Sequence, residues 1–152
     1  MKTTILILIF TIFSYNNDIK NIRVLFLSAH KSESNCDKFG KELNRIDIKR
    51  NALIQGYQAC YYFIKCKHIT NPINKLSLFN KGKKLLESAI QEDPQSIELS
   101  LLRYCIQKKL PRVLLYYDNL EKDLIFVNEN MINIKDKATK DFVVYSLSTI
   151  NI

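Results

Sequence analysis

The chain has 152 residues, enough for one domain, and a globule of this size buries about 68–70% of the surface that its unfolded chain exposes. Hydrophobic residues make up 47% and charged residues 25%, which excludes an intrinsically disordered chain. Its 3 glycines and 3 prolines are too few for a turn-dense β-sandwich or barrel, so we expect an all-α fold. The net charge is +8, but no run of basic residues is longer than two, which indicates a solvated basic face rather than a specific anion site.

The first residues have the pattern of a secretory signal peptide. Met1 and Lys2 supply one positive charge, and an uncharged apolar run follows over residues 3–13. The run is too short to span a bilayer, which takes about 20 apolar residues. We therefore predict a signal peptide over residues 1–14 and a single mature domain over residues 15–152, exported to the periplasm or cell envelope. The alternative is a buried N-terminal strand or helix of a cytosolic protein.

Helical periodicity organises the first third of the mature chain. Apolar residues recur at three- and four-residue steps on both sides of the polar segment 31–35, which predicts two short helices. These residues are Ile19, Ile22, Phe26 and Ala29 before the segment, and Cys36, Phe39 and Leu43 after it. A core helix is expected over residues 51–65, where Gly56 and Ala59 leave room for a neighbouring helix to approach closely.

Prolines divide the middle of the chain. Asn71 and Pro72 predict the start of a helix, which ends before Pro94 because the residue preceding a proline is pushed out of the helical conformation. Its apolar side is expected to consist of Leu76, Phe79, Leu86 and Ile90. Ser96 is expected to cap the next helix, which Pro111 closes. The inner side of that helix is Leu99, Leu102, Cys105 and Ile106.

The last third of the chain is less regular. Residues 113–117 form a short apolar run, and a helical stripe follows. The stripe consists of Leu120, Leu124 and Val127. Residues 142–145 favour a final helix, although their β-branched and aromatic side chains leave a strand as the alternative.

Cysteines and histidines do not form a recognisable site in the sequence. The cysteines are Cys36, Cys60, Cys66 and Cys105. We favour unpaired core cysteines, because cysteine is among the most buried residue types, over disulfides formed in an oxidising compartment. His30 and His68 are too far apart to bind a metal from one helix face, so no metal is expected. Cys66 and His68 resemble a nucleophilic pair, but a cationic helix end is the favoured interpretation.

Charged residues in the second half allow two interpretations. Glu98 with Arg103, and the acidic cluster between Asp118 and Asp123 (with Glu121 and Lys122), are candidates for general acid or base chemistry. Surface ion pairs and helix caps are the simpler interpretation, and we favour it. The sequence contains no glycine-rich phosphate loop, so no nucleotide cofactor is expected.

The order of elements over residues 52–102 resembles a tetratricopeptide hairpin. Gly56 and Ala59 are small residues of the kind found where paired helices touch, and Asp93-Pro94 follows the second helix. The Trp-containing opening of that repeat is absent, and no second full copy can be read. The resemblance therefore predicts one degenerate unit within an array of antiparallel helical hairpins.

Several segments are also similar to a group of small exported helical proteins of Bacteroidota. They are residues 31–39 (KSESNCDKF), 71–90 (NPINKLSLFNKGKKLLESAI), 93–94 (DP), 98–107 (ELSLLRYCIQ) and 119–126 (NLEKDLIF). This resemblance implies a helical fold and export, and it carries over no catalytic or binding residue. One departure is Leu115, because the group would have a glycine before Tyr116.

These observations favour a non-enzymatic protein-interaction module whose partner is an envelope protein. The alternative is a basic envelope protein that binds an acidic polymer or an anionic lipid. Its anion-facing surface would consist of Lys81, Lys83, Lys84, Lys108, Lys109 and Arg112. A small hydrolase that uses a histidine is the third hypothesis. We expect no nucleic acid, metal or cofactor, and no transmembrane helix after signal cleavage.

Overall fold

A computed structural model describes residues 17–47 and 51–150, and every regular element in these ranges is a helix. This confirms the all-α prediction. The alternative of a strand over residues 142–145 is wrong, because these residues lie inside a helix. The predicted signal peptide over residues 1–14 lies outside the described residues. Among the described helices, none combines the length and apolar character needed to cross a bilayer.

The helices follow the predicted order. Residues 17–29 are helical and are called helix 17–29 below. The α-helices after it are α2 (Glu33–Leu43), α3 (Ala52–Lys65), α4 (Pro72–Glu92), α5 (Ile97–Lys109), α6 (Leu120–Asn130) and α7 (Lys137–Ile150). Short 3-10 helices lie between some of them: η2 (Cys66–His68), η3 (Arg112–Leu114) and η4 (Met131–Asn133).

Local side-chain hydrogen bonds fix where the helices begin. The side chain of Asn71 accepts hydrogen bonds from two backbone N–H groups of the first turn of α4, and that of Ser96 accepts one from the first turn of α5. Ser32 and Asn51 cap α2 and α3 in the same way. Such caps satisfy backbone donors that have no partner within the helix. The predicted starts at Asn71 and Ser96 are therefore confirmed.

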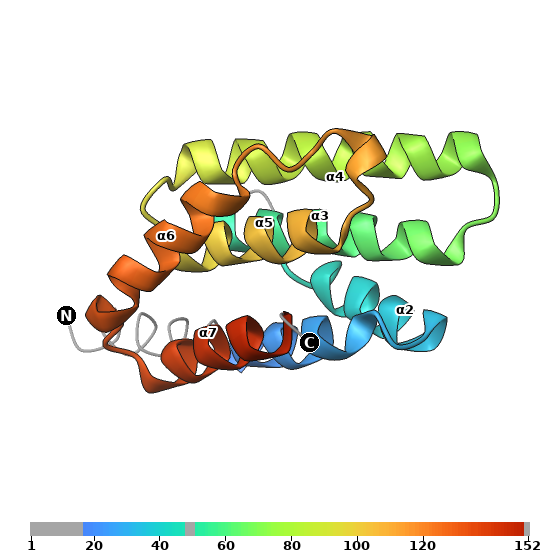
Figure 1. Ribbon diagram of the computed structural model, residues 1–152. Coiled ribbons are helices and arrows are strands. Elements are labelled where there is room, and N and C mark those ends of the chain that lie inside the picture. The colour runs from blue at the N-terminus through green and yellow to red at the C-terminus, as the bar shows by residue number, and fades with distance from the viewer. Residues whose placement is uncertain (1–16, 48–50, 151–152) are drawn as a thin grey trace.

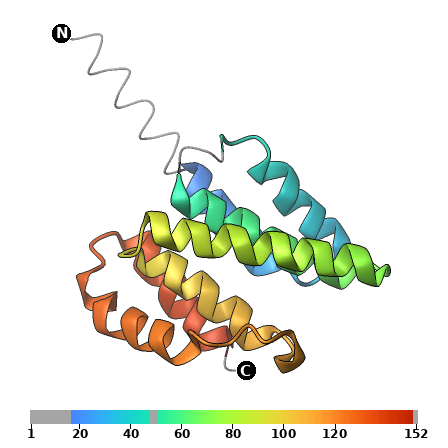
Figure 2. The same ribbon diagram turned by 90° about the horizontal axis from the view of Figure 1, so that it is seen from above.

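The helices pack in three levels. In Figure 1, α4 lies along the top, α3 and α5 lie below it, and helix 17–29, α2 and α7 form the bottom. Figure 2, seen from above, shows α4 with α2 and α3 on one side and α5, α6 and α7 on the other. α3 and α5 are thus covered from both directions, which explains why α5 is buried along most of its length.

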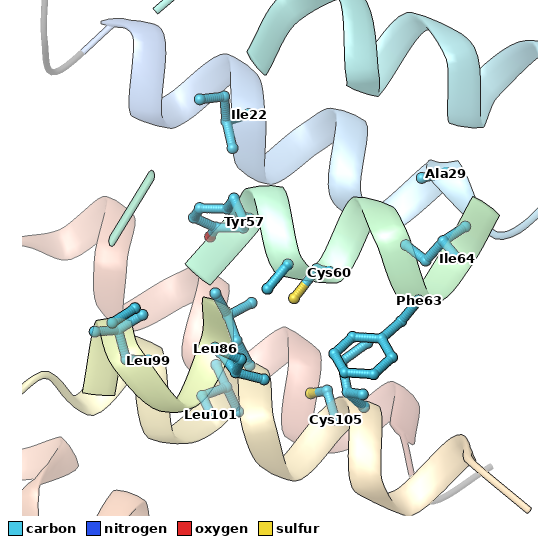
Figure 3. Close-up of a cluster of buried hydrophobic side chains, with 14 of the residues drawn as sticks. Ile22, Ala29, Tyr57, Cys60, Phe63, Ile64, Leu86, Leu99, Leu101 and Cys105 are labelled. Carbon is cyan, nitrogen blue, oxygen red and sulfur yellow. The ribbon is translucent and has the colours of Figure 1, made fainter. Parts of the chain in front are cut away.

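The core is built around α3 and the helices that face it. Figure 3 shows Tyr57 of α3 close to Ile22, and Phe63 of the same helix beside Cys105 of α5. Two glycines allow the close helix contacts. A Cβ on Gly56 would lie 2.3 Å from Leu99 Cδ2, and a Cβ on Gly82 would lie 3.2 Å from the backbone oxygen of Ala59. The predicted close approach at Gly56 is confirmed.

Two pairs of charged residues lie inside the protein, which the surface interpretation did not expect. Glu98 is 5% exposed and Arg103 is 6% exposed, and they do not pair with each other. Glu98 binds Arg23 of helix 17–29, and Arg103 binds Asp123 of α6. The surface interpretation of Glu98, Arg103 and Asp123 is therefore wrong, because each has a partner that lies far away in the sequence and supplies the opposite charge.

The structure changes two further expectations. Leu76, predicted on the apolar side of α4, is 55% exposed, because the first turns of α4 extend beyond the core. Leu115 follows η3 and has a left-handed backbone, with φ 47° and ψ 46°. Left-handed residues are normally glycines, so the glycine that the resemblance places there is explained by the backbone. All four cysteines are free, as favoured, and three of them are buried.

Candidate ligand-binding cavity

A cavity of about 490 Å³ lies where the C-terminal parts of four helices meet. Helix 17–29, α3, α5 and α7 each contribute residues from their last turns or from just beyond their ends. The lining is Phe26, Leu27, His30, Lys31, Phe63, Ile64, Lys67, Cys105, Ile106, Lys109, Leu110, Tyr145, Ser146, Thr149 and Ile150. In Figure 3, Phe63 and Cys105 mark the core end of this region.

The inner walls of the cavity are mostly apolar. Phe63, Cys105 and Ile106 line it and are buried. Phe26 is half-buried and packs edge-on against Tyr57 and Phe142, which continue the apolar surface into the core. An apolar inner wall with a few polar groups is typical of sites for small molecules.

The outer part of the cavity is basic. His30, Lys31, Lys67 and Lys109 line it and are exposed, and no Asp or Glu is part of the lining. None of the three lysines forms an ion pair with a described carboxylate. The open side of the cavity therefore has a positive charge that the described side chains do not neutralise.

His30 responds to these charges. Partial desolvation lowers the pKa of His30, and the charges of Lys67, Lys31 and Lys109 lower it further, whereas a hydrogen bond to the backbone of Leu27 acts in the opposite direction. His30 is thus surrounded by a cation from η2, a cation from α5 and its own chain neighbour. The three lysines are far apart in the sequence, but all of them lie near His30.

Ser146 adds a polar point to the α7 wall. It is 3% exposed, and its hydroxyl has no hydrogen-bond partner among the described residues. Burying an unpartnered hydroxyl costs about 1–3 kcal/mol, so native proteins rarely keep one without a reason. A ligand with a polar atom near Ser146 would complete this wall.

The cavity lacks an activated nucleophile within the described chain. Burial raises the pKa of the Cys105 thiol to about 12, which keeps it protonated at neutral pH. The Ser146 hydroxyl makes no hydrogen bond to His30, and the Thr149 hydroxyl donates to the backbone oxygens of Tyr145 and Ser146. The buried carboxylates Glu98 and Asp123 do not line the cavity and are already bound to arginines.

The predicted pair of Cys66 and His68 is not arranged for catalysis. The Cys66 thiol lies within hydrogen-bonding distance of the backbone oxygens of Tyr62 and Lys75, and burial raises its pKa. His68 has a buried Nε2 without a described partner. Over residues 17–47 and 51–150, no three His, Cys, Asp or Glu side chains are grouped as metal ligands would be.

The six cations predicted to face an anion lie in different environments. Lys81 and Lys83 of α4 lie over the rings of Tyr62 and Tyr116, 4.5 and 5.0 Å from the ring centres, and Arg112 lies 5.1 Å from the ring centre of Tyr117. Of the six predicted cations, Lys109 alone lines the cavity, while Lys84 and Lys108 are exposed elsewhere on α4 and α5.

Most of the basic side of the cavity was therefore not predicted from the sequence. His30, Lys31 and Lys67 were not assigned to one site, although each follows or ends a predicted helix. The available signal was the repeated pattern of an apolar pair followed by a cation near a helix end.

No family model, curated protein or solved structure matches this chain.

Proposed function

We propose that this chain is a non-enzymatic binding protein that holds one small, largely apolar molecule in the cavity between helix 17–29, α3, α5 and α7. The observation that carries the proposal is the cavity itself. Its volume of about 490 Å³ lies within the range of about 300–1,000 Å³ that is usual for small-molecule sites. The cavity is open to solvent on one side, so a ligand can enter it without a change of fold.

The chemistry of the lining supports binding rather than reaction. The described residues place no carboxylate, metal group or activated nucleophile at the cavity. Its apolar wall and the unpartnered Ser146 hydroxyl are the features of a site that recognises a molecule by shape and by a small number of polar contacts.

The earlier predictions of context are part of this proposal. Export through a signal peptide at residues 1–14 would deliver the protein to the periplasm or envelope, where amphiphiles are abundant. A tetratricopeptide-like hairpin and a partner protein remain predictions, as does the surface of six cations on α4, α5 and η3. Among the predictions from the sequence, the cavity gives most support to the alternative, which is binding of an anionic lipid.

Filling the cavity tests the proposal. We would titrate the protein with N-phenyl-1-naphthylamine, a neutral dye that fluoresces in apolar surroundings; the absence of tryptophan keeps the background low. Ser146→Leu should reduce the fluorescence, because its added carbons occupy part of the cavity. Val144→Leu is the matched control, since Val144 lies on the same helix, is 49% exposed and does not line the cavity.

Far-ultraviolet circular dichroism would confirm that both variants remain folded. Ile106→Phe, from the α5 wall, is a second filling variant in case Ser146→Leu does not fold. Unchanged dye binding in a folded filling variant would show that the proposed site is wrong.

A further inference from the structure

The cavity is polarised, and this polarity identifies the class of molecule that fits it. Its inner residues are buried and apolar, whereas His30, Lys31, Lys67 and Lys109 are exposed on its open side. A ligand that satisfies both parts has an apolar body and one charged end of negative sign. A purely polar anion would leave the apolar wall uncovered, and a neutral hydrocarbon would leave the cations without a partner.

We propose that the cavity binds a single-chain amphiphile with one carboxylate, with the chain against Phe26, Phe63 and Ile106 and the carboxylate among Lys67, Lys109 and Lys31. This inference rests on the proposed function, because it specifies the ligand of the same cavity. A chain of methylene groups matches an apolar wall that presents few hydrogen-bonding groups. A single carboxylate matches three lysines that form no ion pair with a described carboxylate.

The helix ends work against an anion, so their effect has to be compared with that of the lysines. Each helix C-terminus has about half a negative charge, and four of them meet here, which gives about two negative charges in total. The three lysines exceed this with three positive charges. Lysine ammonium groups are also carried on long flexible side chains and can reach a ligand, whereas the backbone carbonyls are fixed.

The shape of the site distinguishes this ligand from larger anions. An acidic polymer has no apolar body to fill the inner wall, and a membrane surface cannot enter a cavity whose inner residues, such as Ile106 and Ser146, are at most 8% exposed. One chain with one head group is the occupant that covers the apolar residues and pairs with the lysines at the same time.

Ligands that differ only in the head group provide the test. Dodecanoate and dodecyltrimethylammonium, each below its critical micelle concentration, and dodecanol, below its solubility limit, would be used to displace the neutral dye from the full chain. We expect dodecanoate to bind roughly tenfold more tightly than dodecanol, since two exposed ion pairs contribute about this factor. The cation should bind most weakly, and raising the salt concentration should reduce the advantage of the acid.

Variants assign the preference to the lysines. The double substitution Lys67→Ala, Lys109→Ala should bring the affinities for dodecanoate and dodecanol together while leaving dodecanol binding unchanged. The double substitution Lys81→Ala, Lys84→Ala is the matched control on α4, outside the cavity, and should retain the preference.

His30 offers a second readout that a surface interaction would not change. Its pKa, followed by nuclear magnetic resonance with His68→Gln to assign the signals, should rise when dodecanoate binds and not when dodecanol binds.

Equal affinities for acid and alcohol with an unchanged His30 pKa would overturn the ligand class and leave the cavity as a site for neutral molecules. Failure of all three chains to displace the dye would overturn the cavity as an amphiphile site, and dye binding that Ser146→Leu leaves unchanged would overturn the proposed function itself. Binding to anionic vesicles without binding of free dodecanoate would also overturn the inference.

Discussion

The buried pair of Arg23 and Glu98 makes a quantitative prediction about stability. Arg23 donates two hydrogen bonds to the carboxylate of Glu98, at 2.8 Å from Nε and 2.6 Å from Nη2, and the Tyr57 hydroxyl donates another. The side chains of Arg23 and Glu98 are 11% and 6% exposed. Burial alone would lower the pKa of Arg23, but the hydrogen bonds and the charge of Glu98 more than compensate for it and raise the pKa.

Glu98→Gln keeps the volume of the side chain and removes its charge. Arg23 then remains buried without a counter-charge, and breaking a buried ion pair in this way costs about 3–5 kcal/mol. Because glutamine retains one oxygen that can accept a hydrogen bond, we expect a loss near the lower limit, about 3 kcal/mol. This is a large part of the 5–15 kcal/mol by which a typical domain is stable.

Urea denaturation followed by far-ultraviolet circular dichroism measures this loss. Glu33→Gln is the matched control: Glu33 also pairs with a cation, Lys65, but its side chain is 60% exposed, so the cost should stay below about 1 kcal/mol. In the double variant Arg23→Met, Glu98→Leu, both charges are replaced by apolar groups. That variant should be more stable than Glu98→Gln, since no unpaired charge remains inside. A loss below about 1 kcal/mol for Glu98→Gln would refute the reasoning that the pair is buried and mutually dependent.

Three further predictions follow from single positions. Gly56→Ala should destabilise the protein by about 2 kcal/mol, because its Cβ would lie 2.3 Å from a fully buried Leu99. Adding Leu99→Val to this variant should recover part of the loss, and urea denaturation of the unaltered protein and of both variants tests this. Leu115→Gly should stabilise the protein by about 1 kcal/mol and raise its melting temperature by about 2–4 °C, because it removes a leucine from a left-handed backbone conformation. Val113→Gly nearby is the control and should give no gain in stability. The pKa of His30 is lower in the folded than in the unfolded chain, so the unfolded chain binds more protons and stability should fall as the pH drops below about 6.5. His30→Asn should flatten this slope between pH 7.5 and 5.5 in denaturation experiments, and an unchanged slope would show that His30 does not cause it.

The helix boundaries were predictable because they depend on local chemistry. Asn71 and Ser96 cap helices through hydrogen bonds to N–H groups two or three residues away, and Pro94 and Pro111 act on the residues next to them. Each of these signals is contained in a few consecutive residues. The left-handed backbone at Leu115 is also local, but a leucine gives no sign of it in the sequence.

The burial of the charged side chains could not be predicted, because it depends on residues that are distant in the sequence. Glu98 lies early in α5, where an acidic residue is normally explained by the helix dipole. Its position inside the protein depends on Arg23, which is 75 residues away in the sequence. Arg103 depends in the same way on Asp123 of another helix, 20 residues away. The pattern of residues along one helix does not show such partners. The sequence therefore favoured surface ion pairs for these residues, and the structure shows that this was wrong.

The cavity shows how a site can be assembled from residues that each have an ordinary local explanation. Lys67 and Lys109 lie at helix C-termini, where cations complement the dipole, and Phe63 and Ile106 are apolar residues of the preceding turns. Taken one helix at a time, no residue of this set requires a ligand. The need appears when four such ends meet, because the cations then exceed what the helix ends require and the apolar turns line a shared space. The comparison of Lys67→Ala, Lys109→Ala with Lys81→Ala, Lys84→Ala separates these two explanations. Dipole compensation predicts a loss of stability for the first pair, whereas a ligand site predicts a loss of head-group preference at unchanged helicity.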